Sequence, residues 1–213
     1  MTIKQPDWRT SDAPVLERTQ RWVERAVIGL NLCPFAKAAQ RKGQIHYVVS
    51  HAQQSLEACV DLEVQLLALY QSDENLHDNT LLIYPECFSD FLDFNQFLDD
   101  ADAALGRLDL VGTIQIASFH PNYQFAGVSP DDLGNFTNRS PHPVLHLLRE
   151  SSIERAVAAF ERPESIYEVN IQTLKQLGRT GWRALDVGPP TLRAPRDPAP
   201  ANCAQLSARK PRD

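Results

Sequence analysis

Strand-like and helix-like segments alternate along most of this chain, and this alternation limits the possible fold more than any other feature. Three runs rich in β-branched and aromatic residues have the composition of strands: 44–50, 80–85 and 112–119. Apolar residues recur at helical spacing in three longer segments: 15–30, 54–71 and 88–105. Because connections of helical length favour parallel neighbouring strands, we predict an α/β fold with a central sheet of at least three strands, parallel or mixed, flanked by helices.

Two more helices are predicted in the last third of the chain, over residues 141–160 and 163–178. Ser140 followed by Pro141 is a favourable helix start, because proline suits the first helical position and the serine hydroxyl accepts from a free amide. We expect one α/β domain over residues 12–183. An N-terminal extension (1–11) precedes it, and a Pro-rich basic tail (184–213), expected to be disordered, follows it.

The charge and the apolar content of the 213 residues exclude several classes of partner. The net charge is −6, so nucleic acid and anionic membrane surfaces are repelled overall. No run reaches the roughly 20 apolar residues of a membrane-spanning helix. The four cysteines lack the CxxC spacing of metal sites, and we expect free thiols. We predict a soluble, cytoplasmic protein that meets any anionic ligand through a few local cations.

The candidate catalytic residues are Cys33 and His120. His120 directly follows the third predicted strand, where a rigidly held imidazole can act as a base or a metal ligand. Cys33 follows the first predicted helix and precedes Pro34, and a nearby histidine or arginine would favour its reactive thiolate. If the strands are parallel, the segments after them meet at one sheet edge, whereas a ferredoxin-like sheet would separate them. The alternatives are an apolar, packed Cys33 and a His120 that only ties down its loop.

A polar loop follows His120 and leads to the Ser140-Pro141 pair. Its predicted role is to bind an anionic substrate, with Asn138 and Arg139 as a clamp beside the amide groups of the next helix. The same side chains would otherwise only cap that helix. The predicted substrate-binding residues are Asn122, Tyr123, Asn138, Arg139 and Ser140.

A metal site is the alternative interpretation of the same region. His142 and His146 stand four residues apart on the predicted helix, and Glu150 continues that face. The alternative metal set is His120, His146 and Glu150. No HExxH motif is present, so metalloprotease chemistry is not indicated.

Three pieces of the sequence are similar to a known family. "GLNLCPFA" (29–36), "SFHPNYQFAG" (118–127) and "NFTNRSPHPVLHLLRE" (135–150) resemble domain of unknown function 1415. The resemblance spans roughly residues 12–178 and implies no particular reaction or cofactor. The family pattern has an aromatic residue where this chain has His142, which implies that this histidine is not essential to the family.

Three functions therefore stay open. The first is a small soluble enzyme that acts on an anionic metabolite through Cys33, His120 and the Asn-Arg clamp. The second is a metal-binding protein or metalloenzyme. The third is a noncatalytic binding module whose polar loop recognises a partner.

Overall fold

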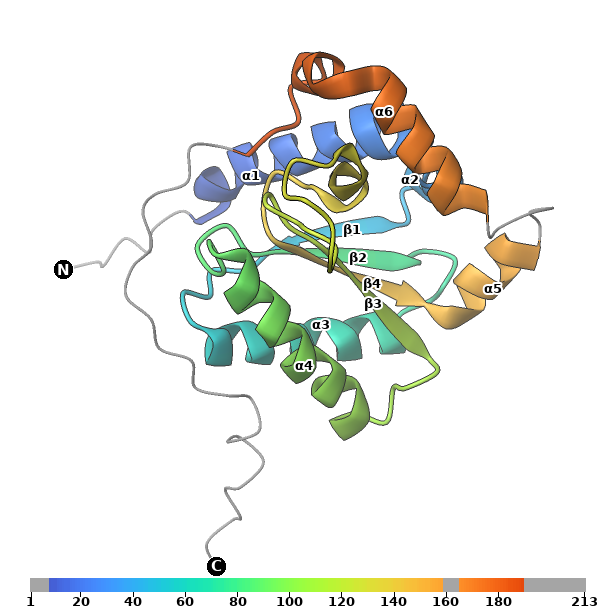
Figure 1. Ribbon diagram of the computed structural model, residues 1–213. Coiled ribbons are helices and arrows are strands. Elements are labelled where there is room, and N and C mark those ends of the chain that lie inside the picture. Colours follow the sequence, from blue (N-terminus) through green and yellow to red (C-terminus); the bar gives the residue numbers. More distant parts are fainter. Residues whose placement is uncertain (1–7, 159–164, 190–213) are drawn as a thin grey trace, which may run out of the picture.

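A mixed sheet of four strands lies between two layers of helices in the computed structural model, which describes residues 8–158 and 165–189 (Figure 1). The strands are β1 (Ile45–Val49), β2 (Asn79–Ile83), β3 (Ile114–Phe119) and β4 (Val144–Arg149), in the spatial order β1-β2-β4-β3. Strands β1 and β2 are parallel, and β4 runs antiparallel to both β2 and β3. The predicted α/β class, with a sheet flanked by helices, is confirmed.

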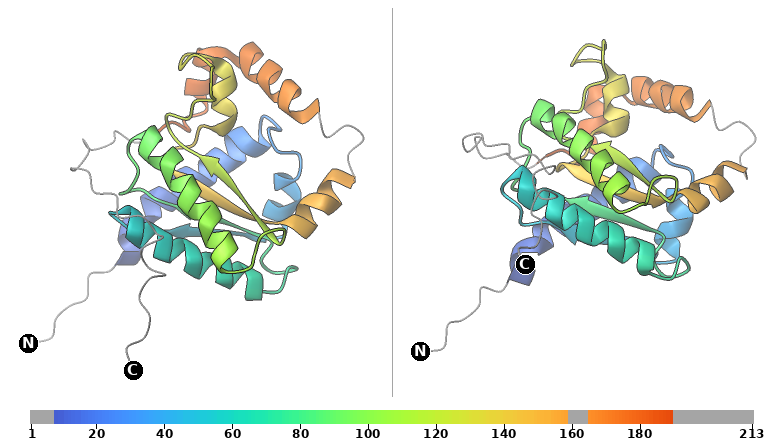
Figure 2. Two further views of the ribbon diagram at one scale, coloured as in Figure 1. Left: turned by 60° about the horizontal axis from the view of Figure 1, so that its bottom comes forward. Right: turned by 90° about the horizontal axis from the view of Figure 1, so that it is seen from below.

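The helices divide between the two faces of the sheet (Figures 1 and 2). Helices α3 (Ser55–Gln71) and α4 (Phe91–Arg107) cover one face. The other face is covered by α1 (Trp8–Trp22), by the π-helix η1 (Val23–Ile28) that continues it, and by α6 (Ile166–Ala184). The shorter elements are α2 (Ala36–Arg41), the 3₁₀ helix η2 (Leu133–Asn138) and α5 (Glu150–Ala158).

Strand β2 packs against helices on both faces of the sheet. Every residue of this strand is buried, which is expected where helices cover both faces. Leu82 and Tyr84 pack with α3 and α4, whereas Leu81 and Ile83 pack with α1, η1 and α6. The Tyr84 hydroxyl also donates to the Ala58 carbonyl oxygen, which attaches α3 to the sheet.

The predicted helix over residues 141–160 is wrong, because its first part is strand β4 and α5 begins only at Glu150. Val144, Leu145 and Leu147 are all buried, since β4 lies between β2 and β3 with both faces covered. Such a continuous apolar run fits a buried strand and a buried helix equally well. Ser140 is not a helix cap, and its hydroxyl donates to the His142 carbonyl oxygen instead.

The direction of the strands gathers several loops at one edge of the sheet. Although the sheet is mixed, β1, β2 and β3 point the same way, and β4 starts where they end. The Tyr84 amide accordingly donates to the Pro143 carbonyl oxygen, and the His120 amide donates to that of Asn138. The segments after the three predicted strands therefore do share an edge, together with residues 140–143.

Two further sequence expectations concern the cysteines and the membrane. Cys33 and Cys87 are free thiols as expected, but Cys59 is disulfide-bonded. Within the described ranges, no helix is both long and apolar enough to cross a bilayer. Most of the predicted N-terminal extension and most of the Pro-rich tail lie outside the described residues.

Candidate anion-binding pocket

A hollow of about 420 Å³ opens beside the sheet edge where β3 ends and β4 begins. Its walls come from α1, the loop after β3, η2, the loop between η2 and β4, and the end of α6 with the residues that follow it. We call it the arginine pocket, and it is lined by Arg18, Pro121, Asn122, Phe136, Arg139, Ser140, Arg179, Trp182, Arg183, Asp186, Val187, Gly188 and Pro189.

Two of the four arginines in the pocket are held in place by the protein. The Arg139 guanidinium donates through Nε to the Tyr123 carbonyl oxygen (3.3 Å) and through Nη2 to that of Pro130 (2.9 Å). It also lies 4.3 Å above the centre of the Phe136 ring. Burial, and then the charge of Arg179, lower the pKa of Arg139. Arg179 in turn is bound to Asp131, at 2.7 Å from both its backbone and its carboxylate oxygen.

The other two arginines, Arg18 and Arg183, have no partner for their charge in the part of the protein that the structure describes. Neither guanidinium makes a hydrogen bond or an ion pair with any residue that the structure describes. The carboxylate that lines the pocket, Asp186, is bound to Arg21 at 2.7 Å, and Arg21 does not line the pocket. The pocket thus holds uncompensated positive charge in a protein whose net charge is negative.

Three of the five predicted substrate-binding residues line this pocket: Asn122, Arg139 and Ser140. Tyr123 contributes only its carbonyl oxygen, which accepts from Arg139. Asn138 points into the fold, where its amide donates to the Ser118 carbonyl oxygen at 3.1 Å. The predicted clamp at a helix N-terminus is wrong in its geometry, because strand β4, not a helix, follows Ser140.

His142 lies next to the pocket and has an unusual environment. Its side chain is buried, with 3% of the residue exposed, and neither ring nitrogen has a hydrogen-bond partner among the residues that the structure describes. Burial, and then the positive charge of Arg18, lower the pKa of His142 to about 4. The ring is therefore neutral at pH 7. Sequence reasoning placed His142 on a helix, whereas it lies in the loop before β4.

The structure does not bring Cys33 and His120 into the arginine pocket. His120 is fully buried; its Nε2 donates to the Phe88 carbonyl oxygen (2.9 Å) and its Nδ1 accepts from the Asn122 amide (3.0 Å). The His120 ring packs on Phe91 and Phe94 of α4. Burial lowers the pKa of His120, so this imidazole is a neutral group that holds its loop.

Cys33 lies in the loop after η1, on the face of the sheet opposite to helix α4, against which His120 packs. Its amide donates to the Val27 carbonyl oxygen, and its neighbour Leu32 packs with the α1 and α6 layer. Burial raises the pKa of the Cys33 thiol, which disfavours the reactive thiolate. The contacts of the two residues therefore give no support to a thiol–imidazole pair.

The alternative metal set is also dispersed. His146 lies in the middle of β4, where its Nε2 is 3.0 Å from Asn79 Oδ1. Glu150 follows the end of that strand, whereas His120 lies at the opposite edge of the sheet. A strand of this length spans roughly 20 Å, too far for one ion. Among the described residues, no group of three or more His, Cys, Asp or Glu side chains is placed to hold a metal.

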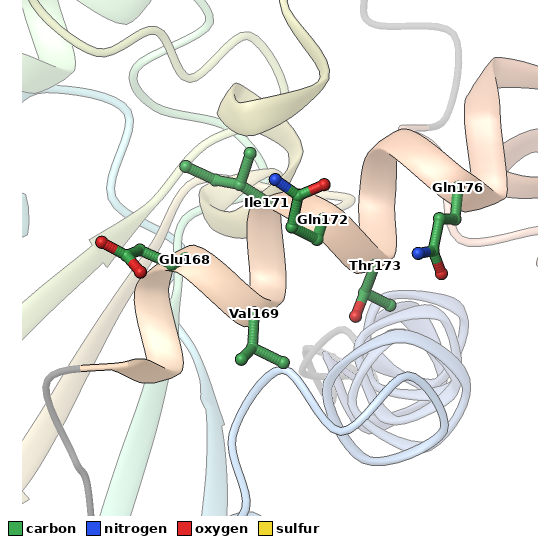
Figure 3. A pocket seen from close by; sticks show the side chains of 6 residues that line it. All are labelled: Glu168, Val169, Ile171, Gln172, Thr173 and Gln176. Carbon is green, nitrogen blue, oxygen red and sulfur yellow. The ribbon is translucent and has the colours of Figure 1, made fainter.

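A second hollow, of about 550 Å³, runs along α6 (Figure 3). All six residues that line it belong to this one helix: Glu168, Val169, Ile171, Gln172, Thr173 and Gln176. Glu168 is the only ionisable side chain among them. This groove brings no separate elements of the fold together around a ligand, and the arginine pocket is the stronger candidate site.

Sequence reasoning missed Arg18, Arg179 and Arg183. Each lies on a helix with polar neighbours, a pattern typical of a solvated helix face. No local motif connects them, because α1 and the end of α6 are about 160 residues apart in the sequence. Only Arg139 carried a recognisable signal, through its place in a loop crowded with polar residues.

The chain belongs to the family described as protein of unknown function (DUF1415), whose model matches residues 14–184. The resemblance inferred from the three sequence pieces is therefore confirmed. The matched range includes all four arginines of the pocket. No curated protein and no solved structure gave a significant match.

Proposed function

We propose that this protein binds a small anionic metabolite in the arginine pocket. The observation that carries the proposal is the pair of guanidinium groups, on Arg18 and Arg183, that face a hollow without any described partner for their charge. Four arginines from three parts of the fold converge there, although the whole chain has a net charge of −6. Cations grouped this closely repel one another, and an anion bound among them relieves that repulsion.

The fixed geometry of Arg139 supports a specific anion-binding site and not only a local cluster of positive charge. Its Nε and Nη2 are fixed by two carbonyl oxygens and its plane rests on Phe136, so its remaining N–H donors have set directions. A guanidinium that is already ordered loses little side-chain entropy when a ligand binds. A volume of about 420 Å³ suits a metabolite and is too small for a polymer.

The proposal keeps the anionic ligand predicted from the sequence and changes the residues that hold it. Asn122, Arg139 and Ser140 stay in the set, Arg18, Arg179 and Arg183 join it, and Asn138 leaves it. Cys33 and His120 receive no catalytic role, because burial disfavours the charged form of each side chain. A soluble protein of the cytoplasm remains part of the proposal.

Anion binding is tested by thermal shift and calorimetry with a panel of phosphate, sulfate, acetate and succinate. The wild type should be stabilised by at least one of these anions. Replacing both Arg18 and Arg183 by alanine should weaken that binding by about 100-fold, since each charge-assisted hydrogen bond contributes about tenfold.

The matched control is Arg155→Ala, because Arg155 is exposed and lies beside Glu74, away from the pocket. This variant should bind the panel as the wild type does. Equal binding by the double variant and the control would contradict the proposal, and so would a wild type that binds none of the anions.

A further inference from the structure

The His142 side chain lacks a hydrogen-bond partner that a buried imidazole normally has. Both ring nitrogens are buried and unpartnered, in a residue that is 97% buried. Among described residues, no other buried side chain has a nitrogen or oxygen atom in this state. A buried polar group without a partner calls for a physical explanation, and an absent ligand is one.

His142 is attached to two residues that line the arginine pocket. The Ser140 hydroxyl donates to the His142 carbonyl oxygen, and the His142 ring lies close enough to Arg18 to feel its charge. Val144, two residues after His142, packs against the layer of α1 and α6. The pocket opens on this same side of the sheet. The His142 backbone is therefore held by the pocket-lining Ser140, and its ring lies within the electrostatic reach of the pocket-lining Arg18.

We infer that the arginine pocket takes a phosphate dianion, free or as the end group of a phosphomonoester, and that His142 is a further binding residue that hydrogen-bonds to it. This inference rests on the proposed anion-binding function and names the chemical class of the ligand. His142 acts as a binding residue, with no proton transferred and no bond broken in the step.

The arrangement of donors favours phosphate over carboxylate. The guanidinium groups come from three directions: Arg18 from α1, Arg139 from the loop after η2, and Arg179 and Arg183 from α6. A carboxylate is planar, carries one charge, and is satisfied by one bidentate arginine. A phosphate has three terminal oxygens and close to two charges at pH 7, so it can accept from several donors on different sides.

The neutral state of His142 fits this role. An imidazole with one N–H gives a donor to a phosphate oxygen and adds no charge to a site where arginines already repel one another. Coulombic repulsion from Arg179 contributes to the lowered pKa of Arg139, which shows that the cations in this pocket are crowded. A further cation would cost more than a neutral donor.

The test measures the affinity for inorganic phosphate by calorimetry at pH 7.5 in the wild type, His142→Phe, His142→Gln and the matched control His146→Phe. Loss of the hydrogen bond from the neutral imidazole to the charged phosphate should weaken phosphate binding by about 10-fold in His142→Phe. His142→Gln retains an amide donor and should recover part of the affinity. His146→Phe removes an imidazole from the same region of the chain but outside the pocket, and should bind phosphate as the wild type does.

A second measurement follows the wild type itself and does not require the phosphate affinity of any variant. In wild-type protein with ¹⁵N-labelled histidine, phosphate should shift the ring nitrogen signals of His142 and leave those of His146 unchanged. The six histidines are assigned by single substitutions.

Each outcome decides the inference. Phosphate affinity that is equal in the wild type and His142→Phe, with an unmoved His142 signal, would overturn it and leave the anion-binding function intact. Tighter binding of acetate or succinate than of phosphate would overturn the ligand class alone. A wild type that binds no anion would overturn both proposals.

Discussion

Replacing His142 by phenylalanine should make the folded protein markedly less sensitive to acid. The folded-state pKa of His142 is about 4, against about 6.5 in an unfolded chain. Between these values the unfolded state binds a proton and the folded state does not, so stability falls as the pH drops from about 6.5 to 4. At pH 5 this linkage removes about 2 kcal/mol of the free energy of unfolding, and at pH 7.5 it removes almost none.

The variant lacks this titrating group, so its stability relative to the wild type should rise by about 2 kcal/mol between pH 7.5 and pH 5. The larger phenylalanine ring and the removal of two unpartnered nitrogens also change stability, by about 1–3 kcal/mol in opposite directions. Both effects are independent of pH. The change in the relative stability of the variant between pH 7.5 and pH 5 therefore reports only the protonation of His142.

Urea denaturation of both proteins at pH 7.5 and pH 5, without added phosphate, measures this difference. His51→Gln serves as the control, because the His51 side chain is half exposed and its removal takes an imidazole from the surface. An offset between His142→Phe and the wild type that is the same at both pH values would refute the reasoning, since it would mean that His142 titrates alike in the folded and unfolded chains.

Three further predictions concern stability and reactivity. Arg149→Met should lower the free energy of unfolding by about 3 kcal/mol, because the guanidinium donates to the carbonyl oxygens of Leu69, Ser72 and His77. Chemical denaturation measures this loss. The control variant Arg155→Met should stay within about 0.5 kcal/mol of the wild type. Asp90→Ala should cost about 1 kcal/mol in a urea titration, since the Asp90 carboxylate caps α4 by accepting from the amides of Leu92 and Asp93. Cys33 should react with iodoacetamide at pH 7.5 at least about tenfold more slowly than glutathione, because burial raises its pKa. Peptide mapping over time follows the reaction, and rapid labelling of Cys33 would restore the thiol hypothesis.

The segments that the sequence predicted well are those whose burial pattern allows one interpretation. The predicted strands 44–50, 80–85 and 112–119 match β1, β2 and β3 to within about two residues at most ends. Helix 54–71 matches α3 almost completely, because its buried residues Cys59, Leu62, Leu66 and Leu69 keep one helical stripe. In these elements local propensity and tertiary environment agree.

Strand β4 could not be predicted, because its environment depends on strands far away in the sequence. Val144 lies opposite both Ile83 and Phe119 in the sheet, and its neighbours along β4 are covered from both sides. From the sequence alone, Ser140-Pro141 followed by an apolar run is a good helix start. The pairing of β4 between β2 and β3 overrides this local preference.

The same insertion of β4 explains why the predicted site was near the pocket but contained the wrong partners. By running back between β2 and β3, β4 brings residues 139–142 to the sheet edge, where α1 passes over them. The residues just after α6 are then fixed on α1 and η1 by two contacts: Arg25 of η1 donates to the Leu185 carbonyl oxygen, and Arg21 of α1 is bound to Asp186.

Arg18 and Arg183 thus face the same hollow only after the first and last helices of the described fold have met. An anion bound between them would connect α1 with α6 and contribute to stability across the chain. For this reason ligand binding should be visible in global unfolding, and the thermal shift measures the site directly.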